Sequence, residues 1–118
     1  MKFQRGDVVI VYFPFSSGTG AKVRPALVVQ NDINNRRLSN LIVATITTMT
    51  RRSDEPTQFL VDLASPIGQL SGLAHDSVVT CENLATLNES LVRAKIGTFP
   101  PSAMSSVDEC LKASLGIP

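Results

Sequence analysis

The sequence predicts a mainly β fold, a small curled antiparallel sheet or barrel, with one helix at its C-terminal end. Short apolar and β-branched runs recur at close intervals, and turn-forming residues separate them. Only after Pro100 and Pro101 does the apolar spacing change to that of a helix. A chain of 118 residues has the size of one domain, so we expect residues 1–118 to form a single domain.

The first half of the chain contains the clearest strands. The first two, 7–13 and 25–30, are apolar runs joined by the flexible Gly- and Ser-rich loop 14–21. The third, 41–49, begins with Leu-Ile-Val-Ala and ends in threonines and a methionine. We expect the connector 31–35 before it to be a turn, because it is rich in Asn and Asp.

Three further strands are expected at 58–63, 77–82 and 93–98, and the connector 51–56 before them is again rich in turn formers. The chain is 43% hydrophobic and only 18% charged, with a mean hydropathy of +0.14. This composition excludes a disordered chain and indicates that most strands are well buried.

The C-terminal segment has the pattern of one helix face. Met104, Val107, Leu111 and Leu115 recur at helical spacing, and Gly116 is placed to end the helix. We therefore expect a single helix, laid on the sheet.

Sequence features also bear on location and redox state. No apolar run approaches the roughly 18 residues that span a bilayer, and the N-terminus lacks the cleavage site of a secretory signal. We expect a cytoplasmic protein with no membrane partner. Because Cys81 and Cys110 have no metal-ligand or CxxC spacing, we expect free, mostly buried thiols.

The net charge of +1 hides a strong asymmetry. Residues 1–52 hold eight basic and two acidic side chains, a net of +6, whereas residues 53–118 carry a net of −5. A basic half can attract a polyanion or an acidic peptide, although solvated loop charges would give the same count.

Two groups of side chains suit a phosphate. Lys22 and Arg24 stand where a buried strand begins, and a guanidinium in that position can bind phosphate oxygens. Thr45, Thr47 and Thr48 close another strand, with the first two expected on one face and Thr48 on the other. A hydroxyl beside Arg24 would add a second kind of donor.

The other ionisable residues limit the chemistry. With His75 alone, an acid–base pair of imidazoles within one chain is excluded, and we expect this residue at the surface. The carboxylates are scattered without metal-ligand spacing, so we expect no metal and no cofactor. An enzyme built on this chain would therefore work by holding phosphate with Arg, Lys and hydroxyl groups.

Four motifs, in order, carry a family resemblance: Arg5-Gly6-Asp7, the run 23–32 with its Arg-Pro pair, the run 41–47, and Asp76-Ser77-Val78-Val79. Together they resemble the MazF/PemK toxins (mRNA interferases) of bacterial toxin–antitoxin systems, nearly end to end. The resemblance implies an SH3-like barrel with a C-terminal helix, the MazF/CcdB-like toxin fold. It also implies a homodimer that cuts single-stranded RNA at short motifs without metal, by attack of the ribose 2′-hydroxyl.

The resemblance also assigns residues. The family's catalytic arginine and threonine fall on Arg24 and Thr47. The loop before the Arg-Pro pair is closer to lysine-bearing PemK-like variants than to those with a Gly-Ser-Glu-Gln loop, and Asn83 stands where relatives often carry Glu-Gln. The expected RNA-binding residues are Ser17, Thr19, Lys22, Thr48 and Asn83. The expected protein partner is an acidic, partly disordered antitoxin, for which the basic half is a natural counterpart.

Two other functions compete with a ribonuclease. One is a protein-directed toxin of the same fold, resembling the gyrase poison CcdB, which is thought to use an aromatic residue near its C-terminal end. This chain has no tryptophan and ends Leu115-Gly116-Ile117-Pro118, which argues against it. The other is a nucleic-acid-binding module that has lost cleavage, against which the presence of Arg24 and Thr47 argues.

Overall fold

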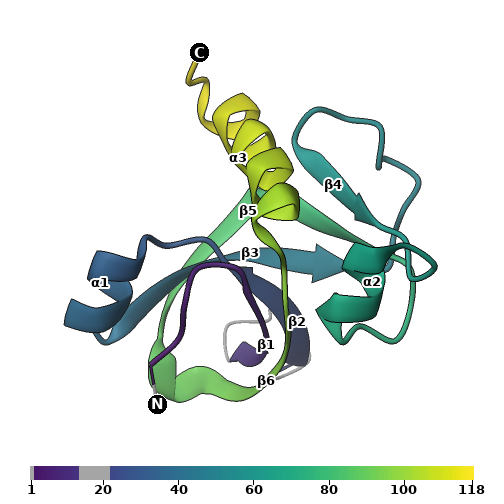
Figure 1. Cartoon of the computed structure of the whole chain (residues 1–118). Helices are drawn as coiled ribbons and strands as arrows, with labels where there is room; N and C mark the ends of the chain where they lie inside the picture. The colour runs from purple at the N-terminus through teal and green to yellow at the C-terminus, as the bar shows by residue number, and fades with distance from the viewer. Residues whose placement is uncertain (1, 14–21) are drawn as a thin grey trace.

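The computed structural model describes residues 2–13 and 22–118 and consists of one strongly curled antiparallel sheet with helices packed around it (Figure 1). Its six strands lie in the order β4-β5-β3-β2-β1-β6. Their bounds are β1 Asp7–Phe13, β2 Lys22–Val28, β3 Asn40–Thr47, β4 Gln58–Val61, β5 Ser77–Asn88 and β6 Val92–Thr98.

The predicted mainly β fold with a C-terminal helix is confirmed, and each predicted strand overlaps an observed one. The closed SH3-like barrel that the family resemblance implied is not confirmed. β4 and β6 are the two ends of the sheet, and no ladder joins them within the described ranges. The sheet is therefore curled but open.

Both faces of the sheet are buried, which explains why its strands read as nearly continuous apolar runs. In β1, Val8 belongs to one core cluster and Val9 to another, and Leu27 and Val28 of β2 divide in the same way. Successive side chains of a strand point to opposite faces, so each strand supplies both clusters. One cluster includes the buried residues of the C-terminal helix, and the other joins residues of β1, β2, β3 and β5 with Phe3.

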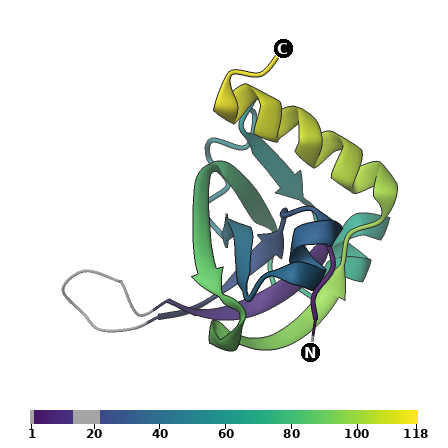
Figure 2. The ribbon, with the colours of Figure 1, turned by 90° about the vertical axis from the view of Figure 1, so that its left-hand side faces the viewer.

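The predicted C-terminal helix is confirmed as α3, Pro101–Leu115, which crosses one end of the curled sheet (Figure 2). It buries Met104 and Val107, while Leu111 packs at the edge of the core. Gly116 ends the helix with φ of +70°, a conformation that glycine adopts without strain. Leu115 does not belong to the buried face as predicted, because it is 59% exposed in the last turn.

The prediction of only one helix is wrong. The segment 31–35, expected to be a turn, begins α1, Asp32–Arg37, whose N-terminus is capped by the Asn31 side chain. α2, Pro66–Ser71, and a 3-10 turn, Glu89–Leu91, were also not predicted. None of the three elements exceeds six residues, which is too short to show a helical period. In the described part of the chain, no helix is long and apolar enough to cross a membrane.

Candidate functional site

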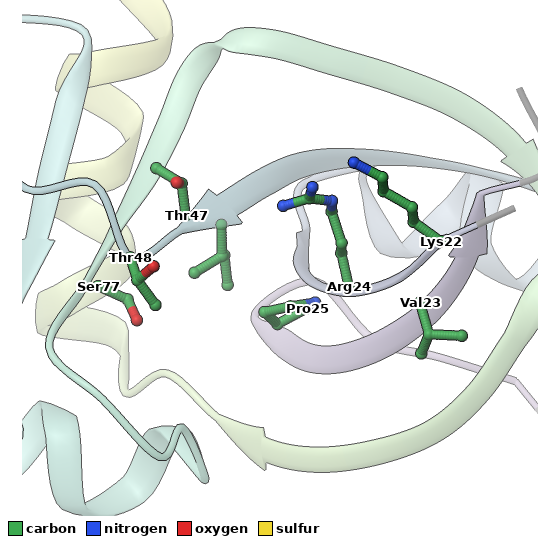
Figure 3. Close-up of a pocket in the computed structure, with 8 residues that line it drawn as sticks. Lys22, Val23, Arg24, Pro25, Thr47, Thr48 and Ser77 are labelled. Carbon is green, nitrogen blue, oxygen red and sulfur yellow. The ribbon is translucent and has the colours of Figure 1, made fainter. Parts of the chain in front are cut away.

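A cavity of about 390 Å³ opens between the start of β2 and the end of β3 (Figure 3). Lys22, Arg24 and Pro25 line it from β2, and Thr47 and Thr48 line it from β3 and the residue after it. The structure thus brings together two groups of side chains that stand more than twenty positions apart in the sequence.

Pro25 explains why the two strands separate at this point. The ladder between β2 and β3 includes Ala26 opposite Thr45 and goes no further toward the start of β2. Continuing the same register would place Arg24 opposite Thr47, but proline has no N–H with which to extend the ladder. The strands part there, and the cavity occupies the space between them.

The cationic side chains at this cavity are exposed. Lys22 and Arg24 both lie among the three exposed residues that begin β2, and their side chains project on the same side of the strand (Figure 3). Neither side chain makes a hydrogen bond or an ion pair with any residue in 2–13 or 22–118. By contrast, Arg5 is held by the Val29 carbonyl and by Asp108. Two unpaired cations can therefore face an anion that enters the cavity.

Local geometry also orients the hydroxyl of Thr47. The backbone N–H of Met49 donates to Thr47 Oγ1 at 3.2 Å. This contact uses a lone pair of the hydroxyl and leaves its hydrogen available to an outside acceptor. Thr48 was expected on the opposite face, yet it lines the same cavity, because β3 ends at Thr47 and the strand alternation ends with it.

A second cavity, of about 200 Å³, adjoins the first and shares Thr47 with it. Asn83, one of the predicted RNA-binding residues, lines this second cavity and not the first. Its other walls include Gln58, Glu82 and two arginines, Arg51 and Arg52, which sequence reasoning did not single out.

An irregularity in β5 places Glu82 and Asn83 in that wall. Leu84 pairs with Ala44 of β3, but the next residue of β3, Thr45, pairs with Thr80. The intervening residues of β5 have no partner on β3, and the strand bends there, as bulges require (Figure 1). A register shift of this kind leaves no mark in the sequence, so the place of Glu82 beside Asn83 in this cavity was not predictable, although Asn83 itself was expected to bind RNA.

Glu82 is held as a carboxylate. Burial alone would raise its pKa, but the hydrogen bond from Gln58 Nε2 to Glu82 Oε2, at 2.7 Å, lowers it. Less direct interactions with its own backbone N–H and with Thr57, together with the charge of Arg52 at 3.8 Å, lower it further. The pKa of Glu82 is below its usual value, so this side chain accepts hydrogen bonds at neutral pH and does not donate them.

The histidine and the two cysteines line neither of the two cavities, and the predicted RNA-binding residues Ser17 and Thr19 lie outside the described residues. His75 is exposed, as expected, and it does not line either cavity. Cys81 and Cys110 are free and buried, which confirms that prediction, and burial raises the pKa of the Cys81 thiol to about 12. Among residues 2–13 and 22–118, no three His, Cys, Asp or Glu side chains converge to hold a metal ion.

Comparison with known proteins places this chain in a family. Residues 4–115 match the family described as PemK-like, MazF-like toxin of type II toxin–antitoxin system. Endoribonuclease EndoA of Bacillus subtilis (strain 168) is 34% identical over 118 residues, covering 99% of this chain and 97% of that protein. Endoribonuclease MazF of Staphylococcus epidermidis is 30% identical over 115 residues, covering 97% and 92%. A solved endoribonuclease in complex with its cognate antitoxin, from a mycobacterial species, superposes with a TM-score of 0.76 at 24% identity, covering 98% and 97%.

Proposed function

Because this chain belongs to the PemK-like, MazF-like toxin family of type II toxin–antitoxin systems, we propose that it is an endoribonuclease that cleaves single-stranded mRNA at short sequence motifs. The family model covers residues 4–115, and we propose that residues 1–118 act as one toxin domain. The observation that carries the proposal is the cavity that Lys22 and Arg24 line together with Thr47 and Thr48.

In the proposed reaction the ribose 2′-oxygen attacks the neighbouring phosphorus in line with the departing 5′-oxygen. Its bond to phosphorus forms as the bond to the 5′-oxygen breaks, which leaves a 2′,3′-cyclic phosphate and a 5′-hydroxyl. Negative charge grows on the non-bridging phosphate oxygens, and the Arg24 guanidinium stabilises it there. Thr47 donates its hydroxyl hydrogen to one of these oxygens and so orients the phosphate.

The 2′-hydroxyl gives up its proton to water as it attacks, and the departing 5′-oxygen must receive a proton. In the mechanism that the family resemblance implies, Arg24 is its source, although the high pKa of a guanidinium makes that role demanding. Lys22 supplies a second positive charge, and we propose that Thr48, Asn83, Ser17 and Thr19 contact the rest of the RNA. No divalent cation has a role in this scheme, because Arg24, Lys22 and the hydroxyls supply the charge and the donors.

The direct test is incubation of the purified chain with a long RNA of known sequence in EDTA, followed by mapping of the cut ends. We expect fragments with a cyclic phosphate at the 3′ end and a hydroxyl at the 5′ end. Intact RNA after incubation with folded protein, or fragments with 5′-phosphates, would contradict the proposed activity.

Neither alternative function is favoured. Two relatives, 34% and 30% identical to this chain, are named endoribonucleases, and no feature of the described residues points to a protein target in place of RNA. The presence of Arg24 and Thr47 at one cavity argues against a module that has lost cleavage.

We also propose the family's setting for this chain: a cytoplasmic homodimer inhibited by an acidic antitoxin. A structural neighbour is an endoribonuclease solved with its cognate antitoxin, and an acidic peptide is complementary to the unpaired Lys22 and Arg24. Light scattering at micromolar concentration should give twice the 12.7 kDa chain mass. A monomer would contradict the assembly but not the cleavage chemistry.

A further inference from the structure

The second cavity has the size for one small planar group. Its volume of about 200 Å³ is below the roughly 300–1,000 Å³ of sites for drug-sized ligands. Because it shares Thr47 with the first cavity, it lies beside the place where the reacting phosphate is proposed to bind.

The inner wall of this cavity is rich in hydrogen-bond acceptors. Gln58 is 8% exposed and its Nε2 donates to Glu82 Oε2, which leaves Gln58 Oε1 without a donor. Glu82 Oε1 also lacks a direct donor, and these are the two buried side-chain polar atoms without a partner among the described residues. Such atoms are rare in folded proteins, so two in one wall mark a place that an outside donor can occupy.

The hydroxyls of Thr45 and Thr80, which line the same cavity, do not supply that donor. Thr80 Oγ1 donates to the Thr45 carbonyl at 2.8 Å, and the Thr45 and Thr80 hydroxyls contact each other at 2.6 Å. Both hydroxyl hydrogens are therefore used within the protein. At the outer wall, Arg51 has no hydrogen-bond partner in the described part of the chain, and Met49 is 59% exposed. A guanidinium plane and a thioether are both suited to lie against the face of a base.

Among RNA bases, guanine matches this wall best. Its Watson–Crick edge carries two adjacent donors, the N1–H and the N2 amino group, which can bind both oxygens of one carboxylate. Its O6 acceptor then faces the arginine or amide donors at the rim, Arg51 and Asn83. Adenine and cytosine each offer an amino group with an acceptor beside it, and uracil offers one N–H between two acceptors, so each of them sets an acceptor against Glu82.

We propose that this cavity is a guanine subsite that reads one base beside the scissile phosphate, with the Glu82 carboxylate as the specificity-determining group and Gln58 as its positioning residue. The inference rests on the proposed ribonuclease function and adds to it the identity of one base in the recognised motif. Gln58 holds the carboxylate through its 2.7 Å hydrogen bond, and Asn83 contacts the exposed side of the base.

The first experiment maps cut sites in a randomised RNA pool. We expect guanosine at one position next to the cut for the wild-type protein, and loss of that preference in Glu82→Gln, because the new amide N–H₂ opposes the base donors. A bidentate base contact predicts a drop of roughly 5- to 150-fold in cleavage of the guanosine motif relative to the other bases. The expected result includes continued cleavage of the pool with relaxed sequence choice.

Glu89→Gln is the matched control. Glu89 has a side-chain exposure of 27% against 26% for Glu82, and it pairs with Lys2 at 3.5 Å where Glu82 lies 3.8 Å from Arg52. It lies at the 3-10 turn and lines neither cavity. We expect this variant to keep the wild-type motif. The same loss of preference in both variants would overturn the assignment to Glu82.

A change in the RNA avoids any effect on folding. Replacing the selected guanosine by inosine removes only the N2 amino group, so wild-type cleavage of that motif should fall, while Glu82→Gln should cut both RNAs equally. A wild-type protein that cuts without guanosine preference next to the cut would overturn the subsite and leave the proposed ribonuclease function standing.

Binding of mononucleotides distinguishes a failure of the guanine subsite from a failure of the proposed ribonuclease function. In titrations with 5′-GMP, AMP, CMP and UMP, we expect GMP to bind most tightly to the wild-type chain and Glu82→Gln to lose this difference. If the chain cuts no RNA but still selects GMP through Glu82, the proposed function is wrong and the subsite stands. Equal binding of the four nucleotides would overturn the subsite regardless of cleavage.

Discussion

Arg24 is the residue on which the proposed reaction depends most, and its surroundings make it open to test. Its side chain is exposed and makes no ion pair or hydrogen bond with the residues that the structure describes. We expect Arg24→Ala to lower the RNA cleavage rate by at least about 100-fold, the effect of removing one donor from a developing oxyanion, with no loss of stability. Cleavage time courses and thermal melting measure the two quantities.

The matched control for this substitution is Arg36→Ala. Arg36 is also exposed and basic, but it lies in α1, which follows the opposite end of β2. We expect this variant to cleave like the wild type. Folded Arg24→Ala protein that cuts at the wild-type rate would remove Arg24 from the mechanism.

At the scale of single residues, the sequence supports part of the site and leaves part of it out of reach. Lys22 and Arg24 could be proposed from their place at the start of a buried strand, and Thr47 from its place at the end of another. Their meeting at one cavity depends on the β2–β3 register and on the break at Pro25, which one sequence does not specify. The resemblance to a family filled that gap, and the roles of these residues stay predictions.

Among the elements, α1 is a helix whose Asn- and Asp-rich sequence resembles that of a loop. Asn35 is buried and exchanges hydrogen bonds with Gln30, donating to its carbonyl and accepting from its Nε2. Asp32 accepts the Arg5 backbone N–H at 2.7 Å and so ties the N-terminal segment to the helix. Asn and Asp were interpreted as turn formers because these partners are distant in sequence or supplied by the backbone.

The Asp32 contact gives the fold a pH dependence. The Arg5 backbone N–H, the Asn35 side chain and the charges of Arg36 and Arg5 lower the pKa of Asp32, despite opposition from burial. A carboxyl group with a lowered folded-state pKa stabilises the fold above its unfolded value, here 3.8, and loses this contribution as the pH falls toward the folded value. We expect Asp32→Ala to be less stable than the wild type at pH 7, and the difference to narrow below pH 4.

Urea denaturation at pH 7 and pH 3 measures this difference in the free energy of unfolding. Asp54→Ala is the control, because Asp54 is exposed in the connector after β3 and makes no hydrogen bond or ion pair with any described residue. A difference for Asp32→Ala that stays constant from pH 7 to pH 3 would show that the carboxylate charge contributes nothing.

The contact between β6 and α2 is another feature of the elements that can be tested. A Cβ added at Gly97 in β6 would overlap the backbone of Ser71 and Leu70 at the end of α2. Backbone cannot move aside as a flexible side chain does, so we expect Gly97→Ala to lower the free energy of unfolding by about 1–3 kcal/mol or more. Gly116→Ala, where the Cβ meets no atom but φ is +70°, should lower it by only about 1 kcal/mol. Equal losses in the two variants would contradict the steric argument.

Across the whole molecule, the two charge halves of the sequence do not stay apart. Three cations of the basic half pair with carboxylates of the acidic half, in the contacts Lys2–Glu89, Arg5–Asp108 and Arg52–Glu82. The net charge of +6 on residues 1–52 therefore overstates what an RNA meets. Three cations at the two cavities, Lys22, Arg24 and Arg51, make no ion pair with the described residues.

The salt dependence of RNA binding distinguishes contact by the three unpaired cations from contact by the whole basic half. For a single strand, the slope of log binding constant against log salt concentration is about −0.7 for each phosphate that a protein cation neutralises. One phosphate for each of the three unpaired cations therefore predicts a slope of about −2. Lys22→Ala should flatten the slope by up to about 0.7 and keep some cleavage, because Arg24 still holds the reacting phosphate. The Arg36→Ala protein should keep the wild-type slope. A slope near −4 would mean that the whole basic half binds RNA.

Cleavage should persist in EDTA, because the scheme uses a guanidinium, an ammonium and hydroxyl groups for charge and orientation. Activity lost on chelation and restored by magnesium would replace this mechanism with a metal-dependent one.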